Sequence, residues 1–245
     1  MPSPLSHEYE LRLLGGFGLL HEGDALDVPV SVRRLLAFLA VNHRSMTRTF
    51  VAGTLWPDTT DVKAAANLRT TLWRLHDLPE PAVVASSATL RLSDVMDVDV
   101  HHLVAIADLL RLGGEIDPPT VDAATLVGEL LPDLSDGWLV FERERLRQIS
   151  LHVLEELSRR LSSSHHHELA ILAGLAAVQA DPLRETANRV LVEAHLGEGN
   201  VAEAVRHFDR FRDLLRRELG VEPNPAFAGL VETQPLPWAT SVTSG

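Results

Sequence analysis

The chain has 245 residues and a formal net charge of −12, with 45% hydrophobic and 23% charged residues. This is the composition of a globular protein, and the length suffices for two domains of modest size. The sequence contains no cysteine, which excludes disulfides, thiolate zinc sites and catalytic thiols. It has no run of 18 apolar residues, and residues 1–10 lack the features of a signal peptide, so we expect a cytoplasmic protein without a membrane span.

The basic residues are 21 arginines and a single lysine, Lys63. No glycine-rich segment precedes Lys63, so the chain has no phosphate-binding P-loop. Residues 33–74 carry seven basic and two acidic side chains, a net +5, whereas the chain after residue 100 is strongly acidic. This distribution suggests two domains with different roles, the first of which is suited to a negatively charged partner.

The first hundred residues change from alternating to helical periodicity and back again. We predict strands over residues 9–13, 17–20 and 25–30, helices over 32–41 (with Ser31 as N-cap), 47–55 and 63–76, and a hairpin over 82–85 and 89–92. The second helix stops before Pro57, because a residue preceding proline avoids the helical region. Three strands, three helices and a hairpin in this order predict an α+β winged helix-turn-helix domain over residues 1–97.

The rest of the chain has helical periodicity only. We predict helices over residues 101–112, 120–131, 138–161, 167–180, 183–196 and 201–219, which form an all-α domain over residues 98–232. Small residues mark expected close contacts between helices (Ala170, Ala173, Ala204), and two of them, Ala170 and Ala204, lie 34 residues apart, the period of tetratricopeptide repeats. The segment 233–245 is rich in proline, serine and threonine, and we expect a flexible tail.

The third predicted helix carries the candidate nucleic-acid-binding face. With Ala65, Leu68, Leu72 and Leu75 turned inward, six side chains project outward or to the flanks: Asn67, Arg69, Thr70, Trp73, Arg74 and His76. Arginine reads guanine edges or holds phosphates, Asn and Thr suit adenine edges or phosphates, and a threonine methyl can contact thymine. The alternative is a solvated helix face whose Trp73 packs on the neighbouring domain.

Further candidate DNA contacts flank this helix. Those near the second helix are Arg44, Arg48 and Thr49, and those on the predicted hairpin are Ser86, Ser87, Thr89 and Arg91. Guanidinium groups and helix N-termini bind phosphates. Arg33 and Arg34 fit phosphate binding and an ordinary solvated surface equally well. The alternative for Arg91, which alternates with Leu90 and Leu92, is an ordinary exposed strand position.

Four segments resemble the Streptomyces antibiotic regulatory protein (SARP) family: residues 13–17, 55–58, 66–75 and 216–225. They read Leu-Leu-Gly-Gly-Phe, Leu-Trp-Pro-Asp, Ala-Asn-Leu-Arg-Thr-Thr-Leu-Trp-Arg-Leu and Arg-Arg-Glu-Leu-Gly-Val-Glu-Pro-Asn-Pro. The resemblance implies an OmpR-type winged helix followed by a bacterial transcriptional activation domain. It implies a transcriptional activator that binds direct repeats in double-stranded promoter DNA and recruits RNA polymerase holoenzyme, often for an antibiotic gene cluster.

The sequence departs from the winged-helix pattern at two places. His76 stands where a further basic residue is frequent, and the hairpin lacks the common Gly-x-Gly-Tyr, reading Ser87-Ala88-Thr89-Leu90 instead. The first departure weakens one phosphate contact, and the second argues against insertion of the hairpin into the minor groove. We expect the acidic helical domain to contact polymerase and a second protomer on DNA, with half-sites 10 to 11 base pairs apart, about one helical turn.

Other interpretations of the sequence concern metal binding, catalysis and a different class of protein. Residues 165–168 (His-His-His-Glu) suit a metal or, better, a polar turn, and residues 142–145 suit a charged surface or a partner contact. No Gly-x-Ser-x-Gly segment holds a nucleophile, so we expect no enzyme, cofactor or metal. The rival function is a protein-interaction adaptor that uses the tetratricopeptide-like domain and does not bind DNA.

Overall fold

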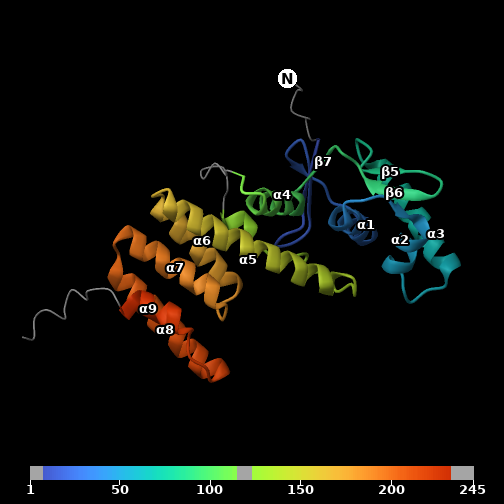
Figure 1. Cartoon of the computed structure of the whole chain (residues 1–245). Coiled ribbons are helices and arrows are strands. Elements are labelled where there is room, and N and C mark those ends of the chain that lie inside the picture. The colour runs from blue at the N-terminus through green and yellow to red at the C-terminus, as the bar shows by residue number, and fades with distance from the viewer. Residues whose placement is uncertain (1–7, 115–122, 233–245) are drawn as a thin grey trace, which may run out of the picture. The chain divides into compact units, whose positions relative to one another are not determined.

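The computed structural model describes residues 8–114 and 123–232 (Figure 1). The chain forms two compact units, of which the first comprises residues 1–105 and 128–146 and the second residues 106–127 and 147–245. This division differs from the expected boundary between residues 97 and 98, because residues 128–146 return to the first unit. No helix of the described residues combines the length and the apolar character needed to cross a membrane.

A four-stranded sheet belongs to the first unit. Its strands lie in the order β3-β2-β1-β7, with bounds Asp24–Ala25 (β3), Gly18–His21 (β2), Tyr9–Arg12 (β1) and Met96–Val98 (β7). β1 is antiparallel to β2 and parallel to β7, and its Tyr9 and Leu11 are buried while the residues after each are exposed. β7 was not predicted, because a three-residue strand is too short to show a period.

The strand expected over residues 25–30 was largely wrong. β3 ends at Ala25, and Val30 already begins helix α1 (Val30–Asn42). Pro29, rather than Ser31, occupies the N-cap position, and its carbonyl accepts hydrogen bonds from the amides of Val32 and Arg33. The β-branched Val28 and Val30 favour a strand, but Pro29 between them has no amide to donate to a ladder.

The next two helices follow the prediction closely. α2 (Arg48–Leu55) starts after Thr47, whose hydroxyl accepts from the Phe50 amide, and it ends before the Trp56-Pro57 pair. α3 (Asp61–Arg74) is capped in the same way by Thr60 and continues into the short 3-10 helix η1 (Leu75–Asp77). Threonine at both N-caps satisfies an amide that the helix leaves without a partner.

A three-stranded sheet completes the winged helix-turn-helix domain. Its order is β4-β6-β5, with bounds Met46–Thr47 (β4), Thr89–Leu92 (β6) and Val83–Ala85 (β5). The β5-β6 hairpin confirms the predicted one, and we call it the wing. β4, which joins α1 to α2 and pairs with β6, was missed because it has two residues.

The second unit is helical. Helix α4 (Asp99–Arg111) and helix α5 (Leu139–Ser163) each begin in the first unit and end in the second. The following helices are α6 (His167–Ala180), α7 (Glu185–Glu198), α8 (Val201–Leu219) and α9 (Pro225–Glu232). α6 and α7 approach closely, since a Cβ on Gly174 would lie 3.0 Å from the Leu191 Cα. Ala170 and Ala173 on α6 are fully buried, as the small residues predicted.

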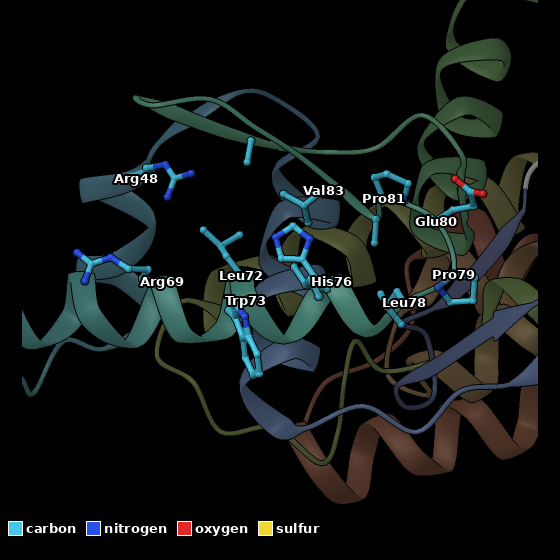
Figure 2. Close-up of a pocket in the computed structure, with 13 residues that line it drawn as sticks. Arg48, Arg69, Leu72, Trp73, His76, Leu78, Pro79, Glu80, Pro81 and Val83 are labelled. Carbon is cyan, nitrogen blue, oxygen red and sulfur yellow. The ribbon is translucent and has the colours of Figure 1, made fainter.

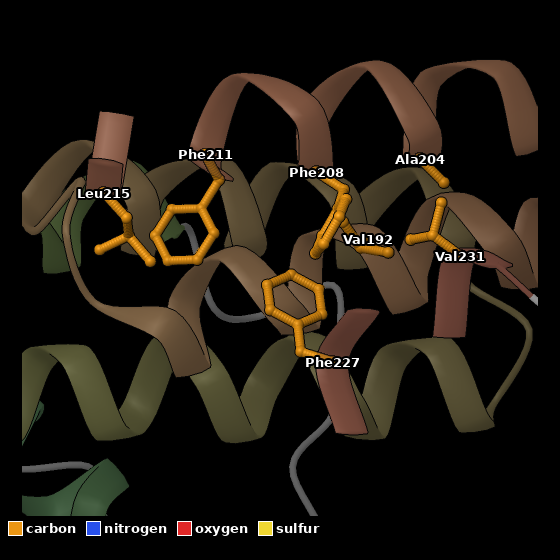
Figure 3. Close-up of a cluster of buried hydrophobic side chains, with 7 residues drawn as sticks. All are labelled: Val192, Ala204, Phe208, Phe211, Leu215, Phe227 and Val231. Atoms are coloured by element: carbon orange, nitrogen blue, oxygen red, sulfur yellow. The ribbon is translucent and has the colours of Figure 1, made fainter. Parts of the chain in front are cut away.

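An apolar cluster joins α7, α8 and α9 (Figure 3). Its members are Val192, Ala204, Phe208, Phe211, Leu215, Phe227 and Val231. The Phe227 ring meets the Phe208 ring edge-on, with centroids 5.1 Å apart, and lies 5.8 Å from the Phe211 ring. α9 was not predicted, because its eight residues make only about two helical turns, too few to define a helical stripe.

The helix expected over residues 120–131 was wrong in its described part. Residues 120–122 lie outside the described residues, Ala123–Leu126 form a 3-10 turn (η3), and Leu130 forms a bridge with Leu14. A Cβ on Gly128 would stand 2.9 Å from the Gly15 amide nitrogen. This close approach of two backbone segments, more than a hundred residues apart in sequence, overrides the local helical pattern.

Candidate nucleic-acid interface

Helix α3 has one buried and one exposed face. Ala64, Leu68 and Thr71 are buried on α3, and Leu75 is buried just after it. The predicted buried stripe was therefore wrong at Ala65, which is exposed, and Leu72 is only partly buried. At 100° per residue, the face opposite the buried one holds Val62, Ala66, Arg69, Thr70 and Trp73, all exposed.

Trp73 projects into solvent, with 68% of its surface exposed. An exposed indole of this size is unusual on a helix unless a partner covers it. Figure 2 shows Trp73 with Arg69 on α3 and Arg48 on α2, which together line one groove of about 510 Å³. His76, exposed as expected, and Val83 of the wing line the same groove.

The cations of α3 lack carboxylate partners within the described residues. The Arg69 side chain makes no hydrogen bond or ion pair there, and the Arg74 guanidinium donates only to the Ser31 hydroxyl, at 3.2 Å. Lys63, at the start of the helix, is exposed and forms no ion pair in the described part of the chain. These charges are therefore available for an anion from outside the chain.

The polar residues Asn67 and Thr70 are less available than the sequence suggested. Asn67 is partly buried on the flank of α3. The Thr70 hydroxyl donates to the Ala66 carbonyl at 3.1 Å, one turn earlier on the same helix. Because the hydroxyl is engaged in this hydrogen bond, the methyl group is the part of the Thr70 side chain that remains available to a partner.

Arg48 connects α2 to the wing. Its Nε donates to the Ser86 carbonyl at 2.8 Å, and its amide donates to the Ala88 carbonyl at 3.0 Å. Arg48 and the exposed Thr49 also line a second groove between α2 and α3, together with Arg69. The structure thus brings together Arg48, Thr49 and Arg69 from two helices.

The hydroxyls of the wing are engaged within its own turn. The Ser86 hydroxyl oxygen accepts from the amides of Ala88 (3.1 Å) and Thr89 (2.8 Å) and lies 3.0 Å from the Thr89 hydroxyl. Ser87 at the tip is exposed. Ser86 and Thr89 therefore shape the turn, and Ser87 is the residue of the set whose hydroxyl makes no hydrogen bond within the described residues.

Arg44 and Arg91 line a separate groove, of about 390 Å³, which also includes His43 and His101. The Arg91 guanidinium forms an ion pair with Asp94 at 2.7 Å, and this contact lowers the pKa of the Asp94 carboxyl. Arg44, in the loop after α1, is exposed and unpaired within the described residues. The two arginines are thus not part of the α3 groove.

Two cations of the basic segment are neutralised within the first unit. Arg33 pairs with Asp27 at 2.6 Å. Arg34 is largely buried, pairs with Asp136 and donates to the Leu55 carbonyl. Sequence reasoning left both residues open, and the partner of Arg34 could not be foreseen, because Asp136 lies 102 positions away.

Two further runs, residues 165–168 and 142–145, had alternative interpretations in the sequence. The described residues hold no group of three or more side chains suited to a metal. The Arg145 guanidinium pairs with Glu142 at 2.7 Å, while Arg143 donates to the Leu130 carbonyl at 2.8 Å. Arg143 therefore fastens the loop before α5, a structural role that its sequence neighbours did not reveal.

Comparison with known proteins gives consistent matches. Residues 123–233 match the family model described as the bacterial transcriptional activator domain. The chain is 30% identical over 218 residues to the regulatory protein AfsR of Streptomyces coelicolor, covering 82% of this chain and 21% of that protein. It is 29% identical over 234 residues to AfsR of Streptomyces griseus, covering 90% of this chain and 23% of that protein. The chain thus spans about a fifth of the length of these relatives.

A solved structure has the same fold. Mycobacterium tuberculosis EmbR, in complex with a low affinity phosphopeptide, superposes with a TM-score of 0.69 at 20% identity. The match covers 94% of this chain and 66% of that one. At this identity the likeness establishes the winged helix-turn-helix and helical architecture and no more.

Proposed function

Because the chain belongs to the Streptomyces antibiotic regulatory protein family, we propose that it is a transcriptional activator that binds promoter DNA through α3 and the wing. One observation carries the proposal. Arg69 and Arg74 stand without carboxylate partners in the described residues, and Arg69 shares the exposed face of α3 with Trp73. Cations without carboxylate partners, next to an exposed aromatic ring, are suited to bind the phosphates that line a groove of DNA.

In this proposal α3 enters the major groove. Arg69 contacts a guanine edge or a phosphate bidentately, and Trp73 packs against the sugar-phosphate backbone. Arg48, Thr49 and the amides at the N-terminus of α2 set the register on phosphates, as does Ser87 at the tip of the wing. Arg44, Arg91 and His76 are further candidate contacts along the same duplex.

The helical unit supplies the activating surface. Residues 123–233 match the activator domain, so we assign contacts with RNA polymerase holoenzyme to this unit. A second protomer binds the adjacent repeat, with half-sites about 10 to 11 base pairs apart. The net charge of −12 weakens non-specific binding to DNA, and pairing on direct repeats restores affinity at the promoter.

The regulated genes belong to a secondary-metabolite cluster in this proposal. Two Streptomyces regulatory proteins are similar to the chain, which supports this assignment. A biosynthetic cluster next to the gene would support this role, and its absence would contradict it.

The rival function, a protein-interaction adaptor, is favoured by one observation. Helix α6 exposes Leu169, Leu172 and Leu175, with 37%, 52% and 47% of their surfaces accessible. These leucines recur every three residues and form an apolar strip on the helix surface. An activator also needs a protein-binding surface, so this strip is compatible with both functions.

A gel-shift titration of the full chain separates the two functions. The probe is the DNA upstream of the adjacent genes, the control is a coding fragment of equal length, and each is titrated at several salt concentrations. If about five phosphates are neutralised, the log–log slope of affinity against salt should be near −4 to −5. An unshifted probe, or a shift that does not depend on salt, would contradict the activator and support the adaptor.

A further inference from the structure

The outermost line of α3 is a ridge of three aliphatic groups. Val62, Ala66 and Thr70 are spaced four residues apart, on the face opposite the buried Ala64 and Leu68. Residues at this spacing stack one above another along a helix. Val62 is the most exposed of them, with 81% of its surface accessible. We call these three residues the methyl ridge.

The ridge offers methyl groups rather than hydrogen-bonding groups. The hydroxyl of Thr70 is already bonded to the Ala66 carbonyl, at 3.1 Å. A valine in the first turn contributes little to the helix itself, because β-branched side chains lose rotamer freedom there. An exposed aliphatic line on a helix with a free Arg69 therefore needs an apolar partner to gain free energy from burial.

We propose that the methyl ridge reads the C5-methyl groups of thymines in the operator. This inference rests on the proposed function, in which α3 lies in the major groove. The thymine methyl is the one apolar group that base pairs present in that groove, and aliphatic side chains contact it. Recognition helices of this class contact bases mainly through their N-terminal residues, where Val62 and Ala66 lie.

The length of the ridge sets the number of thymines. From Val62 to Thr70 the helix rises about 12 Å, at 1.5 Å per residue. At 3.4 Å per base pair this distance covers about three to four base pairs. We therefore expect thymines at up to three neighbouring positions, next to the base or phosphate that Arg69 contacts.

Removal of the methyl group alone tests the proposal. An operator is first selected with the full chain from a library of random double-stranded DNA. Each thymine is then replaced by deoxyuridine, which keeps the hydrogen bonds and removes only the methyl. Replacing a thymine that faces the ridge should lower the affinity of the protein for the operator about fourfold, the value of burying one methyl(ene) group.

A matched pair of variants links the effect to the ridge. Val62→Ala should abolish the preference for thymine over uracil at one position and leave affinity for the uracil-substituted operator unchanged. Val30→Ala is the control, because Val30 is also an exposed valine in the first turn of a helix, with 60% of its surface accessible. It should leave every thymine preference intact.

Two outcomes separate this inference from the proposed function. Sequence-specific binding without any uracil effect, or an unchanged thymine preference in Val62→Ala, would overturn the methyl ridge and keep the activator. Failure of the full chain to enrich any DNA sequence would overturn both.

Discussion

Helices α3 and α8 both carry several basic residues, and they use them in opposite ways. The five arginines of α8 each lie within 4.0 Å of a carboxylate: Arg206, Arg210, Arg212, Arg216 and Arg217. On α3 neither Arg69 nor Lys63 has such a partner in the described part of the chain. The number of basic residues on a helix is thus a poor guide to binding, and the availability of their charges is a better one.

The difference has an energetic meaning. Ion pairs on a solvated face contribute little to stability, so the pairs of α8 mainly neutralise its surface. The unpaired Arg69 and Lys63 on α3 gain no such interaction within the described residues. Their favourable interaction must come from outside, and phosphates provide it by releasing condensed counterions.

The largest expected effect concerns the buried side of α8. Phe227→Ala should lower the free energy of unfolding of the helical unit by about 3–5 kcal/mol, because a fully buried ring between Phe208 and Phe211 leaves a cavity. Urea unfolding followed by circular dichroism at 222 nm measures the loss. The control is Leu219→Ala, at an exposed position of α8, which should have a much smaller effect. Equal losses in the two variants would show that α9 does not support α8.

The next effect tests the comparison directly. Arg69→Ala should weaken binding to the selected operator by about 10- to 100-fold, the usual cost of losing one arginine contact to a base. Arg210→Ala removes an arginine that is also exposed but lies on α8 and has a carboxylate partner. It should change the affinity for the operator less than twofold. Fluorescence anisotropy with labelled operator measures both. If the two variants lost affinity equally, pairing with carboxylates would not distinguish the two helices.

The smallest effect concerns a titratable group on the inner flank of α8. Burial, with the nearby charges of Arg210 and His195, lowers the pKa of His207 from 6.5 to about 4. The unfolded chain therefore binds a proton between pH 6.5 and 4 that the folded chain does not. His207 contributes stability above pH 6.5, which is lost as the pH falls towards 4.

We expect a loss of about 1–2 kcal/mol over this range, less than the full conversion because solvent reaches part of the ring. His207→Gln should remove this share of the pH dependence and retain a donor for the Asn188 side-chain oxygen, which lies 2.9 Å from the His207 Nε2. Urea melts at pH 7 and pH 4 measure the difference between the two proteins. An identical pH dependence in the variant would contradict the assignment to His207.

Local patterns predicted the elements that carry the site. Thr47 before α2, Pro57 after it and the apolar spacing of α3 fixed two helices to within about two residues, because capping and helical periodicity are properties of neighbouring residues. The exposure of Trp73 and Arg69 followed from the same periodicity. Val62 was missed, since the predicted helix began at Lys63 whereas α3 begins at Asp61.

The sequence alone determined that an α+β region is followed by a helical region. It also determined the family resemblance and which helix exposes its cations to solvent. Only the tertiary structure decided which cations are neutralised, because Arg34 meets Asp136 across 102 residues of chain. It also decided that residues 128–146 belong to the first unit. Contacts between distant segments depend on how whole elements pack, and no local period in the sequence records them.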